Sequence, residues 1–415
     1  MANTNFTINS TDIASGKNLV LKEYIMDRYA ELPNVFKTPT SWACGENSNG
    51  QLGDNTTTPR SSPVQTVAGG NNWKQVATKW DHAAAIKTDG TLWAWGRNDN
   101  GQLGTNDMTN RSSPVQTVAG GTNWKQVSVG FSFTTAIKTD GTLWTWGYNT
   151  FGMLGDGTTT WRSSPVQTVS GGTNWKQVSS AGYSTAAIKT DGTLWVWGAG
   201  SYGGLGDNTT VNKSSPVQTA AAGNNWRTVS KGPNGGGAIK TDGTLWMWGQ
   251  NTDFFSGATG QLGDGTIVSK SSPVQTIAGG TNWKSVHCGG LVTAAIKTDG
   301  TLWVWGYGSN GEMGNNTTAS QSSPVQTVAG GTNWKQVVCT SSYSYGNAIL
   351  AIKTDGTLWA WGQNGSGQLG TNNVTNRSSP VQTVAGGNNW KQIDSGFNSF
   401  VMIRDDSSDI YGDPF

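Results

Sequence analysis

Charge is scarce in this sequence of 415 residues, in which only 13% of the residues are Asp, Glu, Lys or Arg. The formal net charge is +2, and most lysines recur at two equivalent repeat positions, as Lys74 and Lys87 do in one repeat. Lysines spread in this way around a ring form no basic stripe. We therefore expect no nucleic-acid partner.

Cysteine and histidine are also rare, with only Cys44, Cys288, Cys339, His82 and His287. Three cysteines supply neither a disulfide framework nor C-x-x-C metal spacing. Cys288 and Cys339 occupy equivalent positions in successive repeats, so a bridge between them is conceivable, although small residues at that position elsewhere favour free, buried thiols. Two histidines separated by four repeat units form no catalytic or metal constellation. We expect no metal, no cofactor and no enzymatic activity.

The sequence has no apolar run long enough to predict a membrane-spanning helix. The first sixteen residues lack the basic and apolar regions of a secretory signal. Residues 1–40 stand outside the repeat. Their apolar residues between 18 and 32 follow helical spacing before Pro33, which predicts a short amphipathic helix after an extended stretch. Two roles stay open for this segment, a cap on the repeat domain or a docking and oligomerisation segment.

Glycine and tryptophan are abundant instead, with 59 and 22 residues. The twelve residues from Ala85 to Gly96 read Ala-Ile-Lys-Thr-Asp-Gly-Thr-Leu-Trp-Ala-Trp-Gly. Asp-Gly between two apolar runs predicts a hairpin with a two-residue primed turn. Near copies begin at Ala136, Ala187, Ala238, Ala295 and Ala351, and a degraded copy begins at Met402.

The repeat has seven units. Its Ser-Ser-Pro-Val-Gln-Thr motif places prolines at 63, 114, 165, 216, 273, 324 and 380. Each unit offers four short β runs, in the order Trp-Lys-Gln-Val, Ala-Ile-Lys, Leu-Trp-x-Trp-Gly and Pro-Val-Gln-Thr. Four strands per unit at this period predict an all-β fold, a seven-bladed β-propeller over residues 41–415.

The two ends of the repeat array are incomplete in complementary ways. Residues 41–45 match the second strand of the hairpin without a first strand, and residues 400–404 match the first strand without a second. We predict that these two strands pair in a composite closing blade, which removes exposed sheet edges. Residues 409–412 are the alternative closing strand, but they fit the repeat pattern less well.

These motifs resemble the repeat of the regulator of chromosome condensation family. The resemblance covers residues 41 to about 404 and rests on Gly-Gly-x-Asn-Trp-Lys-Gln-Val followed by the hairpin and Gly-Gln-Leu-Gly. It implies a seven-bladed propeller. Family members include a guanine-nucleotide exchange factor for a small GTPase and bacterial relatives that bind a target through loops on one face, and similar near-identical repeats occur in phage proteins. The fold is therefore implied more firmly than the function.

Variation between the repeats is concentrated in two loops, one after Trp-Lys-Gln-Val and one after Leu-Trp-x-Trp-Gly. Because antiparallel strands reverse at each turn, both variable loops should lie at one end of each blade and the constant Thr-Asp-Gly-Thr turn at the other. The variable loops are rich in aromatic residues, which are enriched at recognition surfaces. The predicted binding residues are Trp80, His82, Phe131, Phe133, Tyr148, Phe151, Tyr183, Tyr202, Phe254, Phe255, Tyr307, Tyr343, Tyr345 and Phe397.

The sequence predicts a non-enzymatic binding or structural propeller that recognises a protein or a glycan through this loop face. Low charge and the N-terminal segment suggest a phage virion component, such as a tail, fibre or capsid-decorating protein, that contacts other virion proteins through residues 1–40. One alternative is an exchange-factor-like regulator of a small GTPase, although the only insertions are residues 251–259 and about 341–346. The other is a glycan-acting hydrolase, which needs paired carboxylates. We expect Asp81, Asp99 and Asp253 to lie on different repeat units and not to pair.

Overall fold

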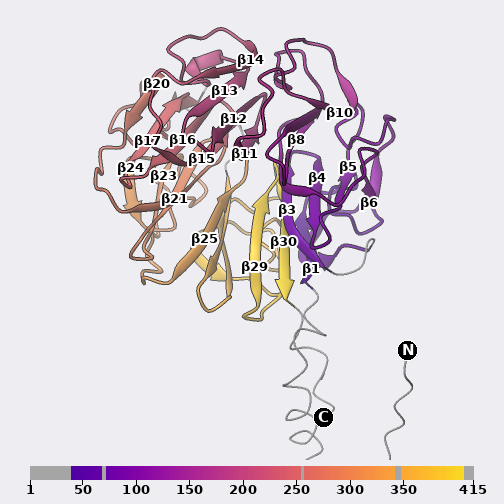
Figure 1. The fold of residues 1–415 in the computed structure, drawn as a ribbon. Coiled ribbons are helices and arrows are strands. Elements are labelled where there is room, and N and C mark those ends of the chain that lie inside the picture. Colours follow the sequence, from indigo (N-terminus) through magenta and orange to yellow (C-terminus); the bar gives the residue numbers. More distant parts are fainter. Residues whose placement is uncertain (1–38, 68–71, 254–256, 342–346, 406–415) are drawn as a thin grey trace, which may run out of the picture. The chain divides into compact units, whose positions relative to one another are not determined.

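The computed structural model describes residues 39–67, 72–253, 257–341 and 347–405 (Figure 1). Two compact units divide the chain, residues 1–37 and residues 38–415, and the described residues lie in the second unit. The one helix among the described residues is a 3-10 turn, η1 (Ser201–Gly203). The predicted helix between residues 18 and 32 lies outside the described part of the chain, and the docking role of residues 1–40 stays a prediction.

Seven four-stranded antiparallel sheets make up the described part of the second unit, which confirms the predicted all-β seven-bladed propeller. Six of these blades are continuous in sequence, and the first strand of each lines a central channel.

The strands of these six blades are as follows. Blade 1 contains β3 (Trp73–Lys79), β4 (His82–Lys87), β5 (Leu92–Gly96) and β6 (Arg111–Gln116). Blade 2 contains β7 (Trp124–Val129), β8 (Phe133–Lys138), β9 (Leu143–Gly147) and β10 (Arg162–Gln167). Blade 3 contains β11 (Trp175–Ala181), β12 (Ser184–Lys189), β13 (Leu194–Gly198) and β14 (Lys213–Gln218). Blade 4 contains β15 (Trp226–Gly232), β16 (Gly235–Lys240), β17 (Leu245–Gly249) and β20 (Lys270–Gln275), with the small hairpin β18 (Thr252–Asp253) and β19 (Gly257–Ala258) inserted. Blade 5 contains β21 (Trp283–Cys288), β22 (Val292–Lys297), β23 (Leu302–Gly306) and β24 (Gln321–Gln326). Blade 6 contains β25 (Trp334–Cys339), β26 (Ala348–Lys353), β27 (Leu358–Gly362) and β28 (Arg377–Gln382).

Blade 7 is composite, as predicted. It contains β29 (Trp390–Ser395) and β30 (Ser399–Asp405) from the end of the chain, and β1 (Pro39–Gly45) and β2 (Arg60–Gln65) from its beginning. Strand β1 pairs with β30 in a register that places Trp42 opposite Met402. Figure 1 shows the yellow strands β29 and β30 beside the indigo strands β1 and β3. Residues 39–45 therefore fill the position for which residues 409–412 were the alternative.

Tryptophan fills the space between blades. Trp73 and Trp95 are fully buried, and their rings lie 6.1 Å apart in a cluster that includes Ala43 and Val401 of blade 7. The Trp95 indole N–H donates to Gln51 O, in a loop that precedes blade 1, at 2.9 Å. Burying an indole of this size contributes roughly 4–6 kcal/mol of transfer free energy, as an upper estimate. Each blade therefore gains much of its core from contact with its neighbour.

The hairpin turn differs from the predicted two-residue primed turn. Strands β4 and β5 are joined by residues 88–91, Gly90 N–H donates to Lys87 O at 2.9 Å, and Lys87 N–H donates to Thr91 O at 3.0 Å. Gly90 has a φ of 81°, whereas Asp89 does not share this left-handed conformation. The turn is therefore a hydrogen-bonded turn followed by a left-handed glycine, a common longer hairpin connection. Asp89 stabilises it by accepting from the backbone N–H and the hydroxyl of Thr91.

All three cysteines are buried and free, which confirms the favoured prediction and excludes a bridge between Cys288 and Cys339. Burial raises the pKa of the Cys44 and Cys288 thiols to about 12. These thiols are therefore protonated at neutral pH and behave as small apolar groups.

Candidate functional site

The two ends of each blade differ in the way the repeat pattern predicts. In blade 1, the connections of residues 80–81 and 97–110 lie at one end, where Arg97 N–H donates to Asp81 O at 2.7 Å. The turn of residues 88–91 lies at the other end, where Trp124 N–H of blade 2 donates to Gly90 O at 3.1 Å. We call the end with the variable connections the diverse face and the end with the Thr-Asp-Gly-Thr turns the constant face.

Seven aromatic side chains meet on the diverse face and form what we call the aromatic cluster. Its members are Trp80, Phe131, Tyr148, Phe151, Trp161, Tyr183 and Phe397. Trp80 stacks on Phe397 of blade 7 with 4.3 Å between ring centroids and meets Phe131 of blade 2 edge-on at 4.1 Å. Phe131 continues to Tyr183 of blade 3 at 4.9 Å. The cluster therefore spans four consecutive blades.

The cluster continues outward over the connection between β9 and β10 of blade 2. Tyr183 contacts Phe151 at 5.3 Å, and Tyr148 contacts the exposed Trp161 at 4.9 Å. Tyr148, Phe151 and Tyr183 are half-buried because they pack on a small core of Phe133, Met153 and Leu154. Rings that are supported from below and open above can contact a partner without rearranging.

Trp80 has a backbone conformation that bulky residues rarely adopt, with a φ of 51°. The equivalent connection of blade 2 contains Phe131. That of blade 3 contains Tyr183, which follows the left-handed Gly182. Such strain persists only where the surroundings hold it, and here Phe131 and Phe397 hold the Trp80 ring from two sides. The local geometry therefore directs an indole onto the diverse face.

The remaining predicted binding residues are placed differently. His82 and Phe133 are fully buried at the first positions of second strands, so the expectation that they are exposed on the loop face was wrong. His82 Nε2 lies 3.1 Å from Thr134 Oγ1 of blade 2, and Phe133 packs on Met153 and Leu154. Tyr202 is 48% exposed and Tyr307 is half-buried, and neither belongs to the aromatic cluster. Phe254, Phe255, Tyr343 and Tyr345 lie outside the described residues.

The central channel is a cavity of about 330 Å³ lined by the first strands of the blades. Glutamine side chains join neighbouring blades along its wall. Gln75 Nε2 donates to Val127 O at 2.9 Å while Gln75 Oε1 accepts from Val127 N–H at 3.1 Å, and Gln126 and Gln177 repeat this arrangement. Gln392 forms the same pair of bonds with Val76 and thereby closes the ring between blades 7 and 1. We call this set of glutamine bonds between neighbouring blades the glutamine ladder. Blades 4 and 5 have Thr228 and Ser285 at the glutamine position.

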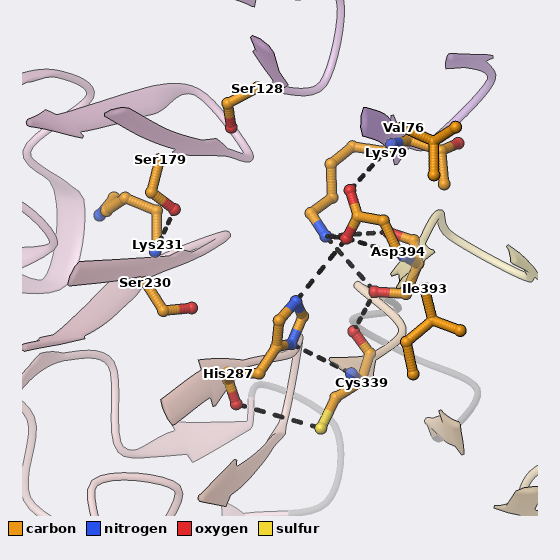
Figure 2. A network of polar contacts seen from close by, with 12 residues as sticks. Val76, Lys79, Ser128, Ser179, Ser230, Lys231, His287, Cys339, Ile393 and Asp394 are labelled. Atoms are coloured by element: carbon orange, nitrogen blue, oxygen red, sulfur yellow. Dashed lines mark hydrogen bonds and ion pairs between the residues drawn. The ribbon is translucent and has the colours of Figure 1, made fainter. Parts of the chain in front are cut away.

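A polar network lies in the channel toward the diverse face (Figure 2). Lys79 Nζ donates to Ser395 O at 2.8 Å and lies 3.5 Å from Asp394 Oδ1, while Thr78 N–H donates to Asp394 Oδ2 at 2.9 Å. Burial alone would raise the pKa of Asp394, but the charge of Lys79 and hydrogen bonds to the carboxylate hold that pKa below its ordinary value. Asp394 is therefore an ionised carboxylate at neutral pH.

His287 joins this network from blade 5. Its Nδ1 accepts from Cys339 N–H at 3.0 Å, and its Nε2 lies 3.9 Å from Asp394 Oδ1. A backbone donor on Nδ1 assigns the proton of the neutral ring to Nε2. Burial lowers the pKa of His287, so the imidazole is neutral near pH 7. The network links blades 5, 6, 7 and 1, and we interpret it as a structural bridge.

Sequence reasoning missed Lys79, His287, Asp394 and Trp161 as members of these two features. The signal was present in the comparison of the repeats: Lys79 aligns with Gly130 and Gly396, and Asp394 aligns with Ser128. Lys79 and Asp394 lie inside strands whose other residues repeat closely between blades. A comparison restricted to the variable loops therefore does not find them.

The carboxylates considered for a glycan-acting hydrolase are Asp81, Asp99 and Asp253. The expectation that Asp81 and Asp99 lie apart was wrong, because both belong to blade 1 and both pair with Arg97, at 3.6 Å and 2.8 Å. Burial raises the pKa of Asp81, and Arg97 opposes that shift. A shared arginine makes these carboxylates an ion-pair network. Within the described residues, no group of three or more potential metal ligands is present. No helix in the described part of the chain is long and apolar enough to cross a membrane.

Comparison with known proteins places these features in a family. The curated ultraviolet-B receptor UVR8 of Arabidopsis thaliana is 32% identical over 279 residues, which cover 66% of this chain and 62% of that protein. The E3 ubiquitin-protein ligase HERC2 of Mus musculus is 29% identical over 370 residues, which cover 84% of this chain and 8% of that protein. The chain thus spans less than two thirds of the length of either relative.

Solved structures share the fold at low identity. Human WBSCR16 superposes with a TM-score of 0.76 at 19% identity, over 89% of this chain and 99% of that chain. Prp20p from Saccharomyces cerevisiae superposes with a TM-score of 0.77 at 17% identity, over 89% of this chain and 92% of that chain. Residues 36–346 match the family model of the RCC1-like domain, and residues 355–403 match the regulator of chromosome condensation (RCC1) repeat. The chain therefore belongs to the family of RCC1-like domains.

Proposed function

We propose that this chain is a protein-binding regulatory propeller that has no catalytic activity of its own and engages its partner through the diverse face. The observation that carries the proposal is the aromatic cluster, in which half-exposed rings from four blades form one connected surface. Clustered aromatic residues dominate the binding energy of many protein interfaces. A surface of this kind on a soluble domain is a liability for aggregation unless a partner uses it.

The relatives support a binding or regulatory role. They include a receptor, UVR8, and the structure of Prp20p is reported with its binding to Gsp1p and histones. HERC2 is named a ligase, but this chain corresponds to only 8% of its length. None of the relatives named above is described as binding a glycan. A protein partner is therefore better supported than a glycan.

Among more specific functions, an exchange-factor-like regulator is favoured over a virion component. Prp20p matches almost the whole propeller in fold, whereas the relatives named above come from Arabidopsis, mouse, human and yeast and give no support to a phage origin. We keep the docking role predicted for residues 1–40 within this proposal for residues 1–38, since Pro39 and Thr40 belong to β1 of blade 7.

Binding of the full chain to purified Gsp1p and to histones, measured by biolayer interferometry, tests the proposal, and release of a fluorescent guanine nucleotide from a small GTPase tests the exchange activity. Single variants Trp80→Ala and Trp161→Ala should weaken binding at least tenfold, since a central aromatic residue commonly contributes about 2 kcal/mol. Tyr202→Ala is the matched control, because Tyr202 is an exposed aromatic residue of the same face outside the cluster. Binding that is unchanged in both cluster variants would refute the diverse face as the interface.

A further inference from the structure

The constant face carries a ring of positive charge around the mouth of the channel. Each first strand has a cation as its second residue, just inside this face: Lys74, Lys125, Lys176, Arg227, Lys284, Lys335 and Lys391. The six lysines are exposed, and Lys335 lines the channel itself. Arg227 Nη2 donates to Trp283 O of the next blade at 2.6 Å, which shows the side chain following the inner rim.

A second set of cations lies farther from the axis on the same face. Lys87 Nζ sits 5.1 Å from the Trp73 ring and 4.4 Å from the Trp93 ring, and the equivalent lysines of the next five blades repeat this contact. Arg404 takes this position in blade 7, 4.3 Å from the Trp42 ring. Cation–π contact holds these side chains over the tryptophan rings.

Among the described residues, this face has fewer carboxylates than cations, and six of the carboxylates stabilise the hairpin turns. Asp89 and its five equivalents accept from the Thr residue two positions later, and hydrogen bonds from Thr91 hold the pKa of Asp89 below its ordinary value. Asp405 lies 3.7 Å from Lys391. Among the described residues, fourteen cations thus share this face with seven carboxylates, whereas the formal net charge of the whole sequence is only +2.

Simple duplication of a repeat does not account for this pattern. Blade 4 departs from the repeat at Thr228, Lys231 and Gly235, yet its inner position changes only from lysine to arginine. The degraded hairpin of blade 7 likewise changes lysine to arginine at Arg404. Both departures among the fourteen positions keep the positive charge.

We propose that the constant-face mouth of the channel binds a compact small molecule that carries several phosphate groups. The first strands of neighbouring blades lie close enough for Gln75 to hydrogen-bond to the backbone of Val127, so the inner cations follow one another on adjacent strands around the axis. Phosphates that point in several directions from one small scaffold meet several of these cations together, whereas a DNA duplex meets only one sector of the ring. A mouth lined by one sign of charge also concentrates such an anion. This site is separate from the protein interface proposed on the diverse face.

Isothermal titration of the full chain with myo-inositol hexakisphosphate in 150 mM salt tests this site. We expect one anion bound per chain. The triple variant Lys74→Gln/Lys125→Gln/Lys176→Gln should weaken binding at least tenfold, and the triple variant with arginine at the same positions should bind within about threefold of the parent chain.

The control removes three cations from the opposite face, in the variant Lys213→Gln/Lys270→Gln/Arg377→Gln. It changes the net charge equally and should leave the affinity within about threefold. Circular dichroism and the thermal midpoint establish that each variant is folded. Absence of binding, equal losses in the two glutamine triples, or displacement of the probe by an equal phosphate concentration of duplex DNA would overturn the proposal.

Discussion

At the scale of single residues, Lys231 is a buried lysine whose charged form lowers the stability of the folded protein. It is 2% exposed, and its Nζ donates to Gly204 O at 2.7 Å, pointing away from the Lys79–Asp394 pair (Figure 2). Burial lowers the pKa of Lys231 to about 7. Holding the ammonium in this position therefore costs stability whenever the group is charged.

Replacing Lys231 with methionine should stabilise the protein in a pH-dependent way. Between pH 7 and about 10.5 the unfolded chain binds a proton that the folded chain does not, so the parent chain gains stability as pH rises through this range and bears the full cost below it. Lys231→Met lacks this cost and leaves Gly204 O bonded to the Trp248 indole at 3.2 Å. We expect a gain of roughly 1–3 kcal/mol at pH 6 that disappears by about pH 10.

Denaturant unfolding at several pH values measures this difference. A gain that stayed constant from pH 6 to pH 10 would show that Lys231 is not the titrating group. Loss of stability in Lys231→Met at every pH would show that its hydrogen bond outweighs its desolvation.

The hairpin turn is the element on which sequence and structure can be compared most directly. Its strands, its place at the constant face and the seven repeats were predictable, because alternating apolar residues and Asp-Gly are local signals. The turn type was not, because it depends on Thr88 and Asp89 keeping negative φ values while Gly90 alone becomes left-handed. The aromatic cluster was predictable in composition, but not in membership, since His82 is buried against Thr134 of the next blade and Phe133 against Met153 and Leu154 of a loop distant in sequence.

Two glycines provide a matched test of this turn. A Cβ on Gly90 would lie 2.0 Å from Thr122 O of the next connection, and its φ is 81°. Gly120 also has a positive φ, 53°, but has open space around it. Gly90→Ala should cost at least about 3 kcal/mol and Gly120→Ala about 1 kcal/mol, measured by tryptophan fluorescence in denaturant. Equal costs would mean that the contact with the next blade can relax freely.

The glutamine ladder can be extended to blade 5. Ser285 occupies the position from which Gln75 and Gln126 reach the next blade, and Val337 stands where Val127 and Val178 accept those bonds. Ser285→Gln should raise the free energy of unfolding by roughly 1 kcal/mol, whereas Ser285→Ala should change it by less than about 0.5 kcal/mol. A glutamine variant no more stable than the alanine variant would argue against the ladder as a source of stability.

Ring closure is the main determinant of stability at the scale of the described propeller. Trp42 of β1 packs edge-on against Trp390 of β29 at 6.3 Å and holds Arg404 over its ring, so distant parts of the sequence share one blade. Trp42→Ala should lower the free energy of unfolding by roughly 3 kcal/mol. Unfolding should remain a single transition by both fluorescence and circular dichroism, because opening blade 7 exposes its neighbours on both sides. Two separate transitions would indicate an array that unfolds blade by blade.

The molecule thus presents two unlike faces, one with an aromatic cluster proposed for a protein partner and one with a cation ring proposed for a polyphosphate. Hydroxyl-radical footprinting of the full chain, alone and bound to whichever of Gsp1p and histones it binds, tests this division most directly. We predict protection of Trp80, Phe131, Tyr183 and Trp161 on the diverse face, with Lys87 and Trp93 at the constant face unchanged. Protection of the constant face with continued exposure of Trp80 and Trp161 would contradict the account.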